Sequence, residues 1–264
     1  CETPLAKAEV AMDNSYKTVT EEALTIKFKL NSGQKIGDWI TDDNTYMLAW
    51  TTTPWTLPGN TALAVNEEID YCLVEKDGEN CILAKERLAV LEEGFNVLKE
   101  FKGKNLVGLE YEPLYEIPAV KNSNKKSHFV ISADFVNTED GTGIVHIAPI
   151  HGEDDYNVGI RYDLPIIPLL DSGGHFNKEA PEFIQGFYLK KGERYIKEDL
   201  EKRGLIFAKQ SHTHSYPHCH RCETPLYYSA LSSWFINIQK VKNRLIQLNE
   251  KINWQPDHLK HGRF

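Results

Sequence analysis

The sequence Thr45-Tyr-Met-Leu-Ala-Trp50-Thr-Thr-Thr53 continues directly into Pro54-Trp-Thr-Leu-Pro-Gly-Asn60. Its first part is rich in β-branched and aromatic residues, which favours a β-strand. The two prolines of the second part fix φ and remove two backbone N–H donors, so a rigid turn follows. We therefore expect threonine hydroxyls and backbone amides at the end of a strand, facing a cleft. A purely structural interpretation stays open, because threonine is common in strands and Pro-Gly in turns.

Strands are also expected on both sides of this stretch. Residues 22–30 alternate apolar and polar, and the further strand-like runs are residues 61–65, 70–74, 81–84, 128–136 and 143–148. Asp77-Gly78 marks a hairpin turn. Helices are expected over residues 85–93, 152–161 and 192–203. Because the strands come in runs and not as regular βαβ units, the sequence predicts an α+β fold, a β-barrel-like domain with inserted helices.

The last part of the chain has a different pattern. Apolar residues recur there at spacings of three and four, at Trp234, Ile238, Val241, Leu245, Leu248 and Ile252. This spacing predicts a C-terminal helix with one apolar face, capped by Ser232 or Ser233 and stopped by Pro256. We therefore divide the chain into a main domain (residues 15–205), a junction (residues 1–14 and 206–232) and a C-terminal helix (residues 233–264).

Composition and charge exclude several classes of protein. The chain has 264 residues, 41% of them hydrophobic, and a formal net charge of −8. No apolar run approaches the roughly 18 residues of a membrane span. The negative charge argues against general binding of nucleic-acid phosphates. Five cysteines are too few for a secreted disulfide framework. Because the first residue is Cys, we expect an internal piece of a longer protein.

A short repeat suggests a metal site in the junction. Cys1-Glu-Thr-Pro-Leu5 recurs as Cys222-Glu-Thr-Pro-Leu226, and Cys219 precedes the second copy in a C-x-x-C spacing. Two such turns supply the four thiolates of a structural zinc site. We expect a zinc ribbon with Cys1, Cys219 and Cys222 as ligands and a fourth ligand upstream of Cys1. The alternative is that Cys219 and Cys222 are unpaired surface thiols.

A second stretch carries titratable side chains where a strand leads into a helix. It reads Gly141-Thr-Gly-Ile-Val-His146-Ile-Ala-Pro-Ile-His151-Gly-Glu-Asp-Asp155-Tyr156. His146 is late in the strand, and Asp155 is in the first helical turn. The structural alternative makes His146 a core residue and the acids favourable charges at a helix start. The histidines at 212, 214, 218 and 220 are irregularly spaced, which favours a polar loop over a metal site.

Together, these stretches resemble one family. Residues 50–60 and 141–156, the segment Tyr216-Pro-His-Cys219 with Cys222-Glu-Thr-Pro-Leu226, and the closing Gly262-Arg-Phe264 resemble the editing (connective polypeptide) domain of isoleucyl-tRNA synthetase, a class I aminoacyl-tRNA synthetase. The related leucine and valine enzymes have Arg before the first proline, where this chain has Thr53. The chain has no His-x-Gly-His and no Lys-Met-Ser-Lys-Ser motif. The synthetic domain, which carries both in this family, is therefore expected to be absent.

The resemblance implies an activity. A hydrophobic pocket separates isoleucine from valine by only about 1–3 kcal/mol, so a second site that destroys valine products is needed. The family's editing domain hydrolyses valyl-tRNA(Ile) and is linked to hydrolysis of valyl-adenylate. The whole enzyme ligates isoleucine to tRNA(Ile) with ATP in the cytoplasm. The implied partners are the valine-carrying tRNA 3′ end and the synthetic domain, with no membrane, and editing needs no cofactor.

The resemblance also implies site residues. Asp155 would anchor the substrate's α-ammonium group, and His146 would bond the substrate and limit the size of its side chain. Thr52 and Thr53 would orient the ester and a water, and Trp50, Thr51, Thr56 and Asn60 would bind or surround the substrate. No Ser-His-Asp or Cys-His pairing is supported, so we expect direct attack by water.

Two other functions stay open at this stage. A metal-dependent hydrolase could use the late histidines and the acidic helix start. A non-catalytic RNA-binding module could be built on the zinc ribbon, although the net charge weighs against it. Lys121, Lys125 and Lys126 could guide an RNA end, or form an ordinary solvated loop.

Overall fold

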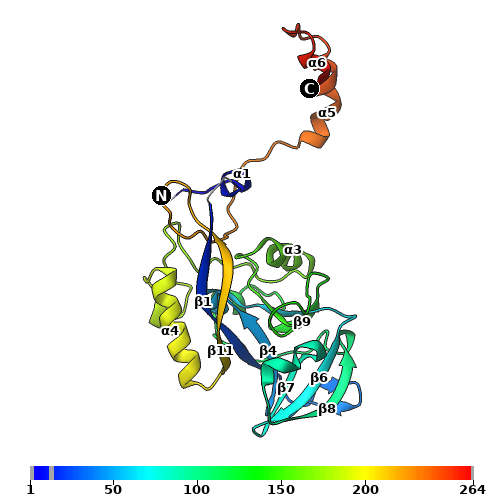
Figure 1. The fold of residues 1–264 in the computed structure, drawn as a ribbon, viewed down its shortest axis with the longest axis vertical. Coiled ribbons are helices and arrows are strands. Elements are labelled where there is room, and N and C mark those ends of the chain that lie inside the picture. Colours follow the sequence, from blue (N-terminus) through cyan, green and yellow to red (C-terminus); the bar gives the residue numbers. More distant parts are fainter. Residues whose placement is uncertain (1–2, 12–14, 263–264) are drawn as a thin grey trace. The chain divides into compact units, whose positions relative to one another are not determined.

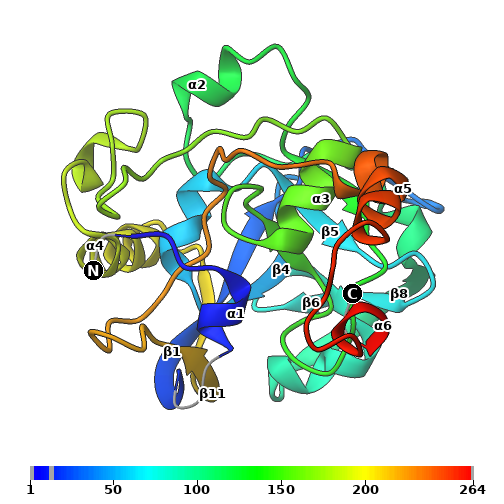
Figure 2. The same ribbon diagram turned by 90° about the horizontal axis from the view of Figure 1, so that it is seen from above.

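The computed structural model describes residues 3–11 and 15–262. Contacts divide the chain into two units, Cys1–Ala230 and Leu231–Phe264. The first unit holds three sheets and most of the helices, which Figure 1 shows in side view and Figure 2 from above. Among the described residues, no helix is long and apolar enough to cross a membrane.

The largest sheet has six strands in the order β11-β1-β4-β7-β6-β8. Its strands are β1 (Tyr16–Lys29), β4 (Thr45–Thr51), β6 (Asp70–Lys76), β7 (Glu79–Ala84), β8 (Phe95–Lys102) and β11 (Ile206–Pro217). Neighbours are antiparallel except β4 and β7. The inner half of β1 and most of β4 are buried, whereas the outer half of β1 is mostly exposed or half-buried and pairs with β11. The expected hairpin is confirmed, with Asp77 and Gly78 both at positive φ.

A three-stranded sheet carries the second motif stretch. It has the order β10-β5-β9, with β5 (Ala62–Val65) in the middle, β9 (Phe129–Ser132) parallel to it and β10 (Val145–Ile147) antiparallel. All four residues of β5 are buried, as expected for a central strand. A two-stranded ribbon of β2 (Lys35–Ile36) and β3 (Trp39–Ile40) completes the strands. The strand order has edges at β11 and β8, and barrel-like closure stays a prediction.

The helices are short. They are α1 (Lys7–Val10), α2 (Pro118–Lys121), α3 (Glu153–Arg161), α4 (Leu189–Lys202), α5 (Ile238–Asn249), α6 (Leu259–Gly262) and the 3-10 helices η1 (Pro54–Gly59), η2 (Lys85–Leu91), η3 (Gly103–Asn105) and η4 (Glu182–Ile184). The helix expected over residues 85–93 is thus a 3-10 helix. Helix α4 starts three residues before Gly192, so this glycine lies inside the helix. A larger residue does not fit there, because a Cβ would lie 2.4 Å from the Phe176 ring.

The structure differs from the expected boundary at residue 205. Residues 206–217 form β11, whose pairing with β1 runs from Tyr16 to Ile26, so this part of the junction belongs to the main sheet. In the second unit, α5 begins at Ile238 and not after Ser232 or Ser233. Asn237 is its N-cap, because its side chain accepts a hydrogen bond from the Lys240 backbone N–H. A second short helix, α6, follows Pro256.

Candidate functional site

The threonine stretch (residues 50–60) folds as the end of β4 followed by η1. The Thr53 backbone N–H donates to Thr51 Oγ1 at 3.0 Å, and the Thr56 hydroxyl donates to the Thr53 carbonyl at 2.8 Å. Pro54 opens the 3-10 helix, where its missing N–H leaves no bond unmade. Thr51 and Thr56 are buried, whereas Thr52 and Thr53 are half-buried. The strand therefore ends with Thr52 and Thr53 accessible and their neighbours fixed beneath them.

Asn60 is an internal connector. Its Nδ2 donates to the Ala62 carbonyl at 2.9 Å and to the Ile147 carbonyl at 3.5 Å. Its Oδ1 accepts from the Tyr111 hydroxyl at 2.7 Å. Because the side chain is buried and both ends are bonded to protein, Asn60 joins η1 to β5 and β10. Tyr111, whose importance the sequence did not reveal, holds this connector in place.

His146 lies on β10 and reaches across to the threonine stretch. Its Nε2 is 3.1 Å from Thr56 Oγ1, and both side chains are buried. Because the Thr56 hydroxyl hydrogen goes to the Thr53 carbonyl, the oxygen accepts from His146, which fixes the hydrogen on Nε2. The Nδ1 atom is buried without a hydrogen-bond partner among the described residues. Burial, with the nearby His151, lowers the pKa of His146 to about 4, so the ring is neutral at pH 7.

Asp155 is in the first turn of α3. Its Oδ1 accepts a hydrogen bond from the Ala148 backbone N–H at 2.9 Å, which closes the loop that follows β10. Burial raises the pKa of Asp155 to about 6, against the opposing effect of backbone hydrogen bonds. The carboxylate is therefore ionised at pH 7 yet partly withdrawn from water. An added cation would find little competition from solvent there.

The structure joins the two motif stretches through a few direct contacts. The Thr56–His146 contact, the Asn60–Ile147 contact and the bond from the Thr61 N–H to the Ile147 carbonyl (2.9 Å) join the threonine stretch to β10. The Trp50 ring is edge-on to His212 on β11 at a centroid distance of 5.0 Å. Gly141 packs against Trp50, where a Cβ would come within 3.0 Å of the Trp50 Cβ. Thr56 and His146 are thus in direct contact, and Asp155 is hydrogen-bonded to Ala148, two residues after His146.

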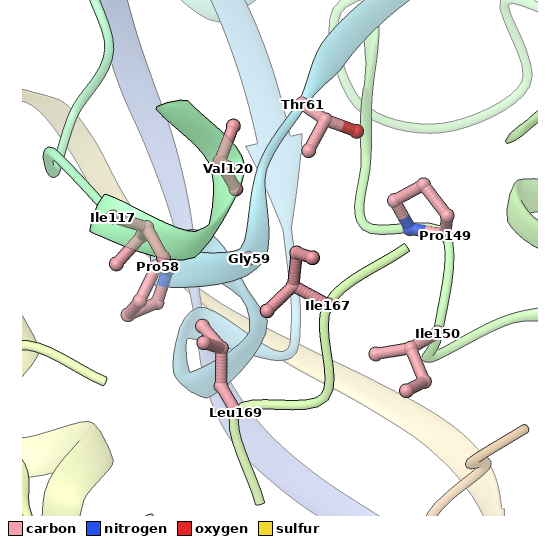
Figure 3. Close-up of a pocket in the computed structure, with 9 residues that line it drawn as sticks. All are labelled: Pro58, Gly59, Thr61, Ile117, Val120, Pro149, Ile150, Ile167 and Leu169. Carbon is pink, nitrogen blue, oxygen red and sulfur yellow. The ribbon is translucent and has the colours of Figure 1, made fainter. Parts of the chain in front are cut away.

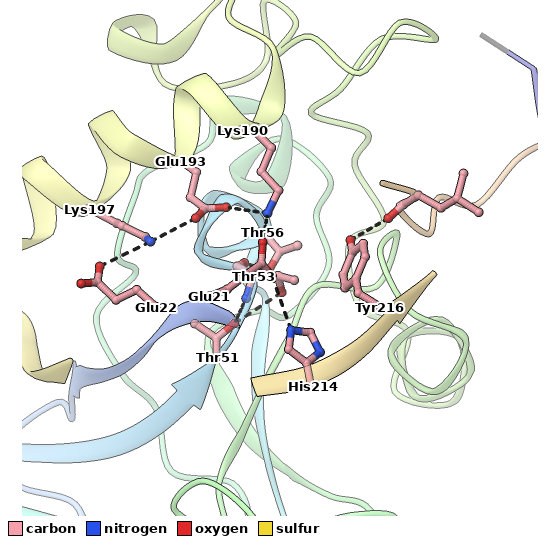
Figure 4. A network of polar contacts seen from close by, with 11 residues as sticks. Glu21, Glu22, Thr51, Thr53, Thr56, Lys190, Glu193, Lys197, His214 and Tyr216 are labelled. Atoms are coloured by element: carbon pink, nitrogen blue, oxygen red, sulfur yellow. Dashed lines mark hydrogen bonds and ion pairs between the residues drawn. The ribbon is translucent and has the colours of Figure 1, made fainter. Parts of the chain in front are cut away.

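A charged network lies in the same close-up as the threonines (Figure 4). Lys190 on α4 pairs with Glu21 on β1 at 2.6 Å, and Lys197 pairs with Glu193 at 3.1 Å. His214 on β11 is 3.5 Å from Glu21. These partly buried charges connect α4 to the β1–β11 ribbon. The sequence did not indicate them, because their partners are up to 193 positions apart along the chain.

An apolar pocket borders both motif stretches (Figure 3). It is lined by Pro58, Gly59, Thr61, Ile117, Val120, Pro149, Ile150, Ile167 and Leu169. Pro58 and Gly59 come from η1, and Pro149 and Ile150 come from the loop before Asp155. None of the predicted catalytic side chains lines it. We therefore assign no substrate to this pocket.

Cys219 and Cys222, which form the cysteine knuckle, supply two thiol ligands suited to zinc. The Glu223 N–H donates to the Cys219 carbonyl at 2.8 Å, and the Cys219 N–H donates to the Thr224 carbonyl at 2.9 Å. Contacts with Thr224 lower the pKa of Cys222 to about 6, which favours the thiolate that a metal requires. Cys1 lies outside the described residues. Within residues 3–11 and 15–262, no group of three His, Cys, Asp or Glu side chains is arranged to hold a metal, so the donors present fit half of a tetrahedral site.

Comparison with curated proteins identifies relatives along the whole chain. No family model matches. The chain is 45% identical over 264 residues to an isoleucine–tRNA ligase of Clostridium acetobutylicum and 42% identical over 265 residues to one of Bacillus thuringiensis. All of its residues are matched in both cases. Over its whole length the chain is homologous to isoleucine–tRNA ligases. It spans about a quarter of the length of these relatives, 24% in both.

Solved structures give the fold of this segment of the ligase family. The chain matches GlLeuRS-CP1 with a TM-score of 0.53 at 15% identity, over 71% of this chain and 99% of that one. It matches the P. knowlesi cytosolic leucyl-tRNA synthetase editing domain with a TM-score of 0.51 at 14% identity, over 72% and 96% of the two chains. The mixed α/β architecture is therefore that of these leucyl-tRNA synthetase domains.

Proposed function

We propose that this chain is the proofreading segment of an isoleucyl-tRNA synthetase and hydrolyses the ester of valyl-tRNA(Ile), and also valyl-adenylate. The observation that carries the proposal is the contact between the two motif stretches through Thr56 and His146. Asp155 accepts a hydrogen bond from the N–H of Ala148, which lies two residues after His146. The family relationship along the whole chain and the fold shared with editing domains support it.

Asp155 is the anchor for the α-ammonium group of the substrate. One carboxylate oxygen already accepts the Ala148 N–H, which sets the orientation of the group. A charge-assisted hydrogen bond to an ammonium is stronger than a neutral one, and stronger again where water is partly excluded. The anchor would hold the ester carbonyl in one place relative to Thr52 and Thr53.

His146 is a wall that limits the size of the substrate's side chain. Its ring is held by Thr56 and is buried with its strand, so it cannot move aside without breaking the Thr56 contact. A close-packed wall can refuse an extra methylene, because overpacking costs about 1–3 kcal/mol. Valine would then be accepted and isoleucine refused. Asn60 supports this wall from behind by fixing the neighbouring Ile147.

The hydrolytic step would be attack by water on the ester carbonyl. Thr52 and Thr53 are half-buried at the end of β4, where their hydroxyls and backbone groups can orient the ester and the water. Trp50, Thr51 and Thr56 would complete the surroundings of the aminoacyl adenosine. An aminoacyl ester is already activated, so positioning and local electrostatic stabilisation account for the chemistry without a covalent enzyme intermediate.

The homology also supports a proposal about the whole enzyme. We propose that the whole enzyme ligates isoleucine to tRNA(Ile) with ATP in the cytoplasm, and that the synthetic domain of the same chain and the tRNA 3′ end are the partners of this segment. Zn²⁺ would have a structural role, held by Cys219, Cys222, Cys1 and a ligand upstream of Cys1. The two described thiols of the knuckle support this assignment.

The test is incubation of the chain with valyl-tRNA(Ile) and isoleucyl-tRNA(Ile), with release of each amino acid measured against time. We expect release of valine and protection of isoleucine. A chelator should leave the rate unchanged, because no metal takes part in the hydrolysis. RNA binding without release of either amino acid would instead support a non-catalytic RNA-binding module and contradict the proposal.

A further inference from the structure

His151 lies between the two predicted catalytic residues of its stretch and has contacts of its own. Its Nδ1 is 3.2 Å from the Tyr228 carbonyl. A carbonyl oxygen can only accept, so Nδ1 carries the hydrogen and donates it, whichever protonation state the ring has. Burial lowers the pKa of His151 to about 4, so the ring is neutral at pH 7 and bears its single hydrogen on Nδ1.

The loop that carries His151 is attached to the end of the first unit. The Ala230 N–H donates to the Ile150 carbonyl at 3.0 Å, next to the His151–Tyr228 bond. Two neighbouring residues of the loop are thus bonded to two residues of the segment 227–230. Ala230 is the last residue of the first unit.

The same two segments enclose a tryptophan of the threonine stretch. The Trp55 ring is edge-on to His151 at a centroid distance of 4.7 Å and edge-on to Tyr227 at 6.0 Å. Trp55 is 4% exposed and follows Pro54 in η1. His151 therefore contacts both the threonine stretch and the segment 227–230.

The loop that carries His151 is short and is hydrogen-bonded to Asp155, the proposed anchor. The His151 N–H donates to the Ala148 carbonyl at 2.9 Å, and the Ala148 N–H donates to Asp155. A shift of His151 would therefore move Ala148, and with it the hydrogen bond that orients the Asp155 carboxylate.

We propose that His151 is a positioning residue that fixes the loop between His146 and Asp155 through its Nδ1–H bond to Tyr228 and its packing on Trp55. It orients the anchor without touching the substrate. The functional part of this inference rests on the proposed editing activity, whereas the structural part does not.

The experiment compares three variants that differ in whether they can donate a hydrogen bond to the Tyr228 carbonyl. His151→Asn places an amide NH₂ where Nδ1 was and can keep the bond. His151→Gln places its amide at the position of Nε2 and cannot, and His151→Phe keeps a ring without a donor. His175→Phe is the matched control, since His175 is also edge-on to a tyrosine, Tyr188, at 5.7 Å and lies outside this loop.

The first readout is hydrogen exchange of the Ala148 and Ala230 amides in the chain without substrate. We expect exchange about tenfold faster in His151→Gln and His151→Phe, as for the loss of one net hydrogen bond, and near the wild-type rate in His151→Asn and His175→Phe. Equal protection of the Ala148 amide in all four variants would overturn the inference, whatever activity the chain has.

The second readout is kcat/KM for valyl-tRNA(Ile) deacylation. We expect a loss of about tenfold or more in His151→Gln and its recovery in His151→Asn. Loss of the same size in both variants, with thermal unfolding unchanged, would contradict positioning through the Tyr228 bond. Absence of turnover in the wild-type chain would count against the proposed function alone, because the exchange measurement needs no substrate.

Discussion

A carboxylate that binds an ammonium group has to remain ionised while it is partly withdrawn from water. Asp155 meets both conditions, because burial raises its pKa to about 6 and the Ala148 N–H still stabilises the ionised form. The sequence could suggest Asp155 as a site residue only through resemblance, since three consecutive acids at a helix start are common. Its bond to Ala148, seven positions earlier, depends on the loop and is visible only in the structure.

At the scale of single residues, the raised pKa of Asp155 predicts how the deacylation rate falls at acid pH. Below about pH 6 the carboxyl takes up a proton and loses its attraction for the ammonium, so kcat/KM for valyl-tRNA(Ile) should fall up to tenfold per pH unit. His146 and His151 titrate near pH 4 and do not contribute between pH 5 and 7. The measurement is the pH–rate profile from pH 5 to 8, with Cys222→Ser as control because that thiol also has a pKa of about 6. A flat profile down to pH 5 would contradict the anchor role.

His146 predicts a change in substrate range. His146→Ala removes the ring that Thr56 holds in place and leaves a space of about the size of several methylene groups. We expect isoleucyl-tRNA(Ile) to become a substrate, with its deacylation rising about tenfold or more, while valyl-tRNA(Ile) is still hydrolysed. The two deacylation rates are measured side by side. Full protection of isoleucyl-tRNA(Ile) in the variant would show that His146 does not limit the size of the substrate's side chain.

The elements that the sequence predicts well are those fixed by local pattern. Alternation identified β1, β-branched content identified β4, and Asp77-Gly78 marked the β6–β7 hairpin. The pairing of β11 with β1 could not be predicted, because it joins residues about 190 positions apart and β11 carries polar residues on both faces. The N-cap of α5 was misplaced for a related reason. Ser232, Ser233 and Asn237 are all good caps, and only the backbone shows which one is used.

Gly143 lets the segment before β10 approach Ala84 at the end of β7, where the Ala84 N–H donates to the Thr142 carbonyl at 2.8 Å. Its φ is +74°, and a Cβ there would lie 2.4 Å from the Ala84 Cβ. Gly143→Ala should therefore destabilise the chain by about 3 kcal/mol, from backbone strain and from the clash together. The measurement is the free energy of unfolding in urea. Gly78→Ala is the control, since it has a similar φ of +81° with nothing within 4 Å of its Cβ, and should cost only about 1 kcal/mol. Equal costs in the two variants would mean that the segment around Gly143 can move away from Ala84.

At the scale of the whole molecule, buried histidines set the acid stability. The pKa values of His146 and His151 are about 4, below the ordinary 6.5, because burial disfavours the charged ring, and burial also lowers the pKa of His128. The unfolded chain therefore binds these protons first, so the stability from these groups is present above pH 6.5 and lost as the pH falls toward 4. Asp155 acts in the opposite direction between about pH 6 and 3.8, because its pKa is raised.

Between pH 7 and pH 5, the stability lost through the three histidines is larger than the stability gained through Asp155. The free energy of unfolding should fall on the order of 3 kcal/mol between pH 7 and pH 5. It is measured by urea unfolding at the two values, with His151→Asn as the comparison, which should lose less stability over the same interval. A chain as stable at pH 5 as at pH 7 would show that these rings are not held neutral by the fold.

The negative charge of Asp155 is the central feature of the proposed editing site. Asp155→Asn keeps an oxygen that can accept the Ala148 N–H, so the loop should stay in place, but removes the negative charge. The decisive measurement is the rate of valine release from valyl-tRNA(Ile) by this variant and by the unchanged chain at pH 7.5. We predict a loss of about 100-fold or more, as expected when a partner of a charged pair is removed. An unchanged rate, with the fold intact, would contradict the claim that this site holds its substrate by the ammonium group.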